Sequence, residues 1–169
     1  GTLANGGSNS SIGASTNGAS NLVISGGTLQ YTGSSVSTDR NFTINDGATG
    51  TIEVTTSGTV LTVSGAAASS TGALTKTGPG TLKLSGANAY TGVTTISAGT
   101  LALSGSGSIA SSSGVTSSGA GVFDVSGTSS GATIVSLTGS STATSGVALG
   151  AKTLTLSNAG GTYSGVIGG

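Results

Sequence analysis

Residues 72–104 read GALTKTGPGTLKLSGANAYTGVTTISAGTLALS and place several short apolar or Thr-rich segments between glycine turns. Each segment is only about four to six residues long, which is too short to bury an apolar face alone. The stretch therefore makes physical sense as one unit of a repeat that stacks on neighbours of the same kind. We expect a single solenoid segment over residues 1–169, with 72–104 as its best-defined unit.

Apolar and polar residues alternate along most of the chain, as in Leu82-Lys83-Leu84, which is typical of strands with one buried face. Helical periodicity is absent, and the Gly, Ser, Thr and Val content disfavours helices. Beyond Gly127 the rhythm loosens, so residues 128–150 are predicted to hold an extended loop or a shifted corner. Before that point many strands end in Ser-Gly or a close variant, and the marker glycines are 18 to 22 residues apart: Gly26, Gly47, Gly65, Gly86, Gly105 and Gly127.

A period of about 20 residues fits one coil of a parallel β-helix, in which each strand pairs with its counterpart one coil further on. Roughly eight coils would make a rod about 40 Å long. Leu, Ile and Val should point inward in columns of like residues, and Thr, Ser, Lys and Asp should point outward. Both ends look cut from a longer array, so we expect an uncapped stack. The predicted core positions are Leu74, Leu82, Leu84, Ile96, Leu101, Leu103, Leu154 and Leu156.

Composition excludes several classes of protein. Charged residues make up 5% of the chain and the formal net charge is zero, so there is no electrostatic footprint for nucleic acid or anionic lipid. Low charge with positive mean hydropathy argues against disorder. No stretch supplies the roughly 18 consecutive apolar residues of a membrane helix, so direct membrane insertion of this segment is not expected.

The stretch beginning at Gly72 resembles the passenger-associated repeat of autotransporters. The resemblance implies a right-handed parallel β-helix that is exported across a Gram-negative outer membrane and is exposed at the cell surface or released. Val93 departs from the pattern, since the family often has a second glycine there. The matching residues are Leu74, Thr75, Lys76, Gly78, Gly80, Thr81, Leu82, Leu84, Gly86, Asn88, Tyr90, Gly92, Thr95, Ile96, Gly99, Thr100 and Leu101.

Catalytic, metal and cofactor sites are not expected in this chain. Without His or Cys, acid-base chemistry would fall to Asp39, Asp46, Glu53 and Asp124, and the candidate pair that would approach across a turn is Asp46 and Glu53. Asn45-Asp46-Gly47 offers oxygen ligands, but too few for calcium, which needs six to eight. Asp39 and Arg40 are interpreted as an exposed pair that stabilises a loop.

The motif residues are interpreted as structural. Asn88 should cap a turn and Tyr90 should cover the end of a coil. Lys76 and Lys83 should keep an outward strand face soluble and discourage sideways pairing. The remaining turn positions are Gly78, Gly80, Gly86, Gly92 and Gly99, where corners need glycine.

The leading functional hypothesis is a structural stalk or spacer of a secreted or surface-displayed passenger, with self-association as an added property. The alternatives are an adhesin module that binds glycans or neighbouring cells, a subunit of a self-assembling extracellular fibre and, much less favoured, a polysaccharide-acting enzyme. Ice binding through Thr-x-Thr rows is also disfavoured, because the sequence shows no regular rows. The expected partners are adjacent repeats of the same chain, further copies of it, or cell-surface glycans.

Overall fold

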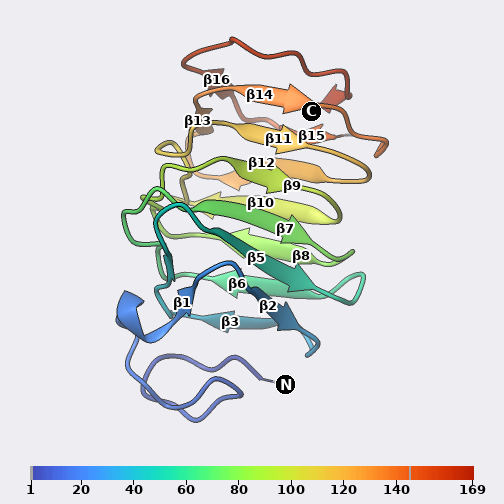
Figure 1. Ribbon diagram of the computed structural model, residues 1–169. Helices are drawn as coiled ribbons and strands as arrows, with labels where there is room; N and C mark the ends of the chain where they lie inside the picture. Colours follow the sequence, from blue (N-terminus) through green and yellow to red (C-terminus); the bar gives the residue numbers. More distant parts are fainter. Residues whose placement is uncertain (1, 145) are drawn as a thin grey trace.

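The computed structural model describes residues 2–144 and 146–169, which form a parallel β-solenoid of about 7 turns (Figure 1). The all-β class is confirmed, and the turn count is close to the roughly eight expected from the period. A single 3-10 turn, η1 (Ala19–Asn21), is the only helical element in the described part of the chain. The strands are β1 (Val23–Ile24), β2 (Thr28–Tyr31), β3 (Val36–Thr38), β4 (Thr43–Ile44), β5 (Thr49–Val54), β6 (Val60–Val63), β7 (Ala73–Thr77), β8 (Thr81–Leu84), β9 (Thr94–Ile96), β10 (Thr100–Gly105), β11 (Val115–Ser117), β12 (Val122–Thr128), β13 (Ala132–Ile134), β14 (Leu137–Gly139), β15 (Val147–Ala148), β16 (Leu154–Leu156) and β17 (Ile167–Gly168).

Each coil contributes strands to two main sheets that run the length of the stack. The seven-stranded sheet has the order β17-β15-β12-β10-β8-β6-β3, and the six-stranded sheet has the order β14-β11-β9-β7-β5-β2. The third side is less regular, with the pairs β1-β4 and β13-β16 and isolated bridges such as Ser70 to Tyr90 between them. All strand pairs are parallel, so neighbouring strands in space come from successive coils in the sequence.

The register explains the slack in the sequence period. Leu82 of β8 pairs with Leu101 of β10, 19 residues on, whereas Val36 of β3 pairs with Leu61 of β6, 25 residues on. The strands stay in register while the corners absorb the difference in coil length. The coil-by-coil pairing predicted from the Ser-Gly markers is confirmed.

The core consists of side-chain columns inside the coils. Six of the predicted core leucines and isoleucines, Leu74, Leu82, Leu84, Ile96, Leu101 and Leu103, are at most 1% exposed. Full burial of such a side chain contributes about 1.5–3 kcal/mol. Leu154 and Leu156 differ from the expectation, because both are only half-buried and pack at the edge of the core. Their strand β16 pairs only with β13 in the described sheet, so less of the chain covers them.

The segment before η1 packs against the coil that follows it in the stack. Residues 2–18 loop across the end next to β3 (Figure 1), and Leu3 joins the core at 4% exposure. Backbone and side-chain bonds fasten the loop, including Thr38 Oγ1 to the carbonyl of Ala4 at 3.0 Å.

The stretch 128–150, where a loop or shifted corner was predicted, holds β13, β14 and β15, which stack on the neighbouring coils. Between β14 and β15 the described residues 140–144 and 146 lie outside strands, and residue 145 lies outside the described residues. A register irregularity also lies just before this stretch. The pairing of β10 with β12 shifts register between Ala102 and Ser104, and β12 then runs on through Gly127.

Candidate functional site

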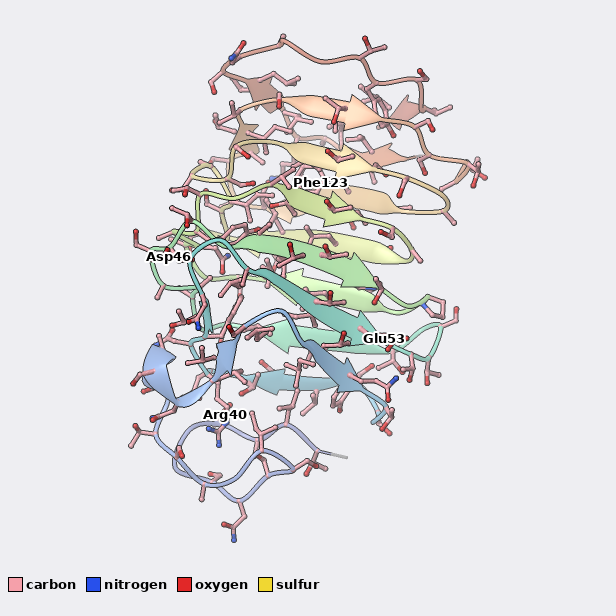
Figure 2. All side chains as sticks on the ribbon, viewed as in Figure 1. Arg40, Asp46, Glu53 and Phe123 are labelled. Carbon is pink, nitrogen blue, oxygen red and sulfur yellow. The ribbon has the colours of Figure 1, made fainter. Side chains whose placement is uncertain are left out.

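The carboxylates do not form a catalytic pair. Asp46 lies in the turn before β5 and Glu53 lies near the far end of that strand, on opposite sides of the molecule (Figure 2). From Thr49 to Glu53 alone the strand spans on the order of 13 Å. Asp46 Oδ1 accepts the backbone N–H of Thr71 at 2.7 Å, and Glu53 Oε2 accepts from Gln30 Nε2 at 2.8 Å. The carboxylates of Asp46 and Glu53 therefore each form a hydrogen bond to a neighbouring coil. The two carboxylates do not approach each other across a turn.

The other two carboxylates also accept hydrogen bonds from the protein itself. Asp39 Oδ1 accepts the N–H of Gly6 at 2.7 Å, and Asp124 Oδ1 accepts from Ser126 within its own strand. Among residues 2–144 and 146–169, three or more His, Cys, Asp or Glu side chains never gather where they could hold a metal ion.

Arg40 is not part of an exposed ion pair. Its side chain is 1% exposed, and its guanidinium donates to backbone carbonyls of the 2–18 loop. Nε bonds to Ala4 at 3.0 Å, Nη1 to Ser15 at 3.0 Å and Nη2 to Gly13 at 2.8 Å. Arg40 does stabilise a loop, but it does so as a buried guanidinium that donates hydrogen bonds to several backbone carbonyls.

Lys76 lies inside the solenoid, so the prediction of an outward side chain was wrong. It is fully buried in β7, between Ile52 and Ile96 of the adjacent coils. Its Nζ donates to the carbonyls of Thr77 at 2.6 Å, Gly78 at 2.8 Å and, more weakly, Ala98 at 3.3 Å. Burial lowers the pKa of Lys76 to about 8, although the negative charge of Glu53 partly opposes the shift.

Lys83 is half-buried on the outward face of β8, as predicted. It pairs with Thr62 on one side and Ala102 on the other. The two lysines of the repeat therefore face opposite ways, one into the core and one toward solvent.

Asn88 holds three coils together. Its Oδ1 accepts the N–H of Ala67 at 2.9 Å, while Nδ2 donates to the carbonyls of Gly86 at 2.9 Å and Ser108 at 3.1 Å. The side chain is 3% exposed. Buried amides with such partners act as structural ties, because loss of the side chain would leave polar backbone groups unpaired.

Tyr90 is enclosed in the core rather than laid over the end of a coil. It is 0% exposed, and its hydroxyl lies 2.7 Å from Thr94 Oγ1, which in turn lies 2.9 Å from Ser112 Oγ. Burial raises the pKa of the Tyr90 phenol, and the hydrogen bond with Thr94 partly offsets that rise. This chain of hydroxyls connects two coils and has no signal in the alternation pattern.

The glycines of the repeat mark corners where coils approach closely. Gly78 and Gly99 have positive φ values of 74° and 63° and lie at neighbouring corners of successive coils. A Cβ at Gly99 would lie 2.4 Å from the carbonyl oxygens of Gly78 and Gly80. Gly86 and Gly92 likewise leave no room, since a Cβ would come within 2.5 Å of a carbonyl in the preceding coil.

A regular row of single threonines, one per coil, lies on the outer face of the six-stranded sheet. It is not a Thr-x-Thr row, because the next outward position along the strands changes from Gln30 to Glu53 to Thr77. Thr28 is exposed and the other five are half-buried, so the row faces outward. Its members stack about 4.8 Å apart, one per coil. The hydroxyls of the last two are 2.9 Å apart and hydrogen-bonded. The row consists of Thr28, Thr51, Thr75, Thr95, Thr116 and Thr138, each paired with the next.

The surface offers little aromatic area. Tyr31 is 4% exposed and Tyr90 is 0% exposed, while Tyr163 is half-buried. A shallow groove on the third side, between residues 105–110 and 130–133, is lined by glycine, alanine, serine and threonine only. In the described part of the chain, none of the helical structure is long and apolar enough to cross a bilayer.

Comparison with known proteins gives two matches. The family model of the passenger-associated-transport-repeat matches residues 74–103. The chain is also 48% identical over 169 residues to the adhesin BmaC autotransporter of Brucella suis biovar 1 (strain 1330). That alignment covers 98% of this chain and 5% of the relative, so the chain spans a small part of the relative's length. No solved structure matches.

Proposed function

Since the chain belongs to the autotransporter passenger repeats, we propose that it is a stalk segment that holds other regions of a surface passenger away from the cell. Family membership implies surface or extracellular export through the outer membrane. The observation that carries the stalk role is the single core cluster, which extends from Leu3 to Val147 without interruption.

The polar side chains support the same role. Arg40, Lys76 and Asn88 direct their donors to backbone carbonyls, and Asp46 and Glu53 accept from the neighbouring coil. Their bonding groups are therefore engaged in holding coils together. In a solenoid built this way, stability is approximately a sum of coils and coil interfaces, which suits a spacer of variable length.

An adhesin module is the second candidate, because the similar protein from Brucella suis is named an adhesin. In this chain adhesion would fall to the outer faces of the sheets. Burial of Tyr31, Tyr90 and both phenylalanines removes four of the five aromatic rings that could stack on a sugar. The stalk role is therefore favoured over glycan binding for this segment.

Deleting one coil in register tests the stalk role. Removal of residues 82–100 joins Thr81 to Leu101, and because Thr81 pairs with Thr100 the strands on either side keep their register. A surface-displayed passenger carrying this deletion should be exported with an exposed tag, and its binding to host cells should be unchanged. The control deletion 82–90 joins Thr81 to Thr91 out of register and should reduce surface exposure.

Binding measurements separate the two candidates. The soluble 169-residue chain should show no saturable binding to host cells or to a glycan array if it is a stalk. Saturable binding that is lost on deletion of residues 82–100 would overturn the stalk role and favour the adhesin module.

A further inference from the structure

The outer face of the six-stranded sheet is nearly free of charge. Its strands contain only two charged residues among the described positions, Glu53 and Lys76. Lys76 is turned into the core, where three carbonyls hold it. Glu53 is half-buried and accepts a hydrogen bond from Gln30. The inward turn of Lys76 therefore leaves the threonine row without a cation beside it.

The seven-stranded sheet differs in this respect. Its outward positions include Lys83 on β8 and Asp124 on β12, each half-buried and facing out. Charged side chains on a sheet surface discourage sideways association with other sheets. The six-stranded face carries one outward charge, Glu53, on the same strand as Thr51, and the other five threonines of the row have no outward charged residue in their strands.

We propose that the threonine row on the six-stranded sheet is a docking surface for a second copy of this chain. Each threonine presents a donor, an acceptor and a methyl group, so a row of threonines is complementary to another such row. The row repeats once per coil, about every 4.8 Å, and a second solenoid has the same repeat. With zero formal net charge, two copies also approach without long-range repulsion.

The area of the six-stranded face determines how strongly two copies of the chain would bind each other. Five steps from Thr28 to Thr138 span about 24 Å along the stack, and the strands are about 10–20 Å long. The face therefore offers about 240–480 Å², below the roughly 800 Å² per partner of a stable interface. One pair of chains should bind weakly, whereas many chains on one surface should bind strongly through multivalency. This inference uses the proposed stalk role in one respect. Stalks that project side by side from a surface present these faces to one another.

Bead clustering tests the proposal in this multivalent setting. The 169-residue chain is biotinylated at one terminus, coupled to streptavidin beads, and bead clusters are counted by microscopy. The test variants are Thr95→Glu and Thr95→Lys, which change the middle of the row. The matched control is Thr62→Glu, also a half-buried outward threonine, but on β6 of the seven-stranded sheet. Circular dichroism and thermal melting establish that every variant is folded.

The proposal predicts that wild-type and Thr62→Glu beads cluster. Beads carrying either Thr95 variant alone should cluster at least about tenfold less, because like charges then face one another. Mixing the Glu beads with the Lys beads should restore clustering, which a misfolded variant could not do.

Folded wild-type beads that stay dispersed would overturn the proposal, as would Thr95→Glu beads that cluster like wild type or a mixture that fails to cluster. Clustering that a soluble glycan panel inhibits would also count against it and would assign the face to a sugar instead. The stalk role is judged separately, by export of the coil deletion and by host-cell binding of the soluble chain.

Discussion

Lys76 should make the stability of this solenoid rise with pH, because its pKa is lower in the folded chain than in the unfolded chain. Its pKa is about 8 in the folded chain and has a reference value of 10.5. Because the folded-state pKa is the lower one, the native protein loses this proton first as the pH rises. The free energy of unfolding should therefore increase between about pH 8 and pH 10.5.

The magnitude follows from the shift. At about 1.36 kcal/mol per pKa unit, the increase between about pH 7 and pH 9.5 is about 2 kcal/mol. Above about pH 10 the trend should reverse, because the pKa of buried Tyr90 is raised and the unfolded chain then loses the phenolic proton first. Guanidinium titrations at about pH 7, 8.5 and 9.5 measure the effect within the window that belongs to Lys76.

Two methionine variants provide the comparison. Lys76→Met should be flat over the window, whereas Lys83→Met, on the outward face, should keep the rise of the wild type. An unchanged slope in Lys76→Met, or a flat profile in the wild type, would refute the assignment of a buried cation at this position.

Three further substitutions probe the stacking. Leu82→Ala should lower the unfolding free energy by about 2–5 kcal/mol in denaturant titrations, because Leu82 is fully buried between two leucines of adjacent coils; a loss under 1 kcal/mol would contradict its core position. Gly99→Ala should be much more destabilising in thermal melts than Gly47→Ala, since both glycines have positive φ but a Cβ at Gly47 meets open space; equal melting shifts would argue against close corner packing. Asn88→Ala should cost about 2–4 kcal/mol and speed hydrogen exchange at the N–H of Ala67; unchanged exchange there would contradict its role as a tie.

The apolar columns could be predicted from the sequence because they depend on local alternation. Leu82 and Leu101 occupy the same position after a Gly-Thr pair, so the pattern reveals both their inward direction and their mutual stacking. Leu154 and Leu156 show the same alternation, yet they are half-buried, because burial also depends on which neighbouring coils cover a strand.

The inward direction of Lys76 was missed because a lysine was expected to face solvent, although the alternation of residues in its strand indicated otherwise. The alternation Leu74-Thr75-Lys76 places the lysine on the same side as Leu74, so its inward direction was available from parity. The three carbonyl partners of Lys76 could not be predicted from the sequence. The carbonyl of Ala98 belongs to the next coil, and the carbonyls of Thr77 and Gly78 are presented to the lysine by the geometry of the corner.

Long-range features had no local signal. The threonine row links residues at unequal sequence intervals, so it becomes visible only once the strand register is known. The burial of Arg40 depends on the loop of residues 2–18, which contacts it from some thirty residues away. Such contacts depend on how segments that are far apart in the sequence pack together, and the local alternation of residues does not encode that packing.

Cysteine cross-linking tests the coil register most directly, because the chain contains no cysteine of its own. Thr75 and Thr95 are direct partners in adjacent coils, while Thr75 and Thr116 are two coils apart. Adjacent coils lie about 4.8 Å apart, within the Cα range of a disulfide, and the second pair lies about 10 Å apart, outside it. On oxidation at low protein concentration, Thr75→Cys with Thr95→Cys should form an intramolecular disulfide, and Thr75→Cys with Thr116→Cys should not. Equal cross-linking of the two pairs, or none in the first, would contradict the stacked solenoid.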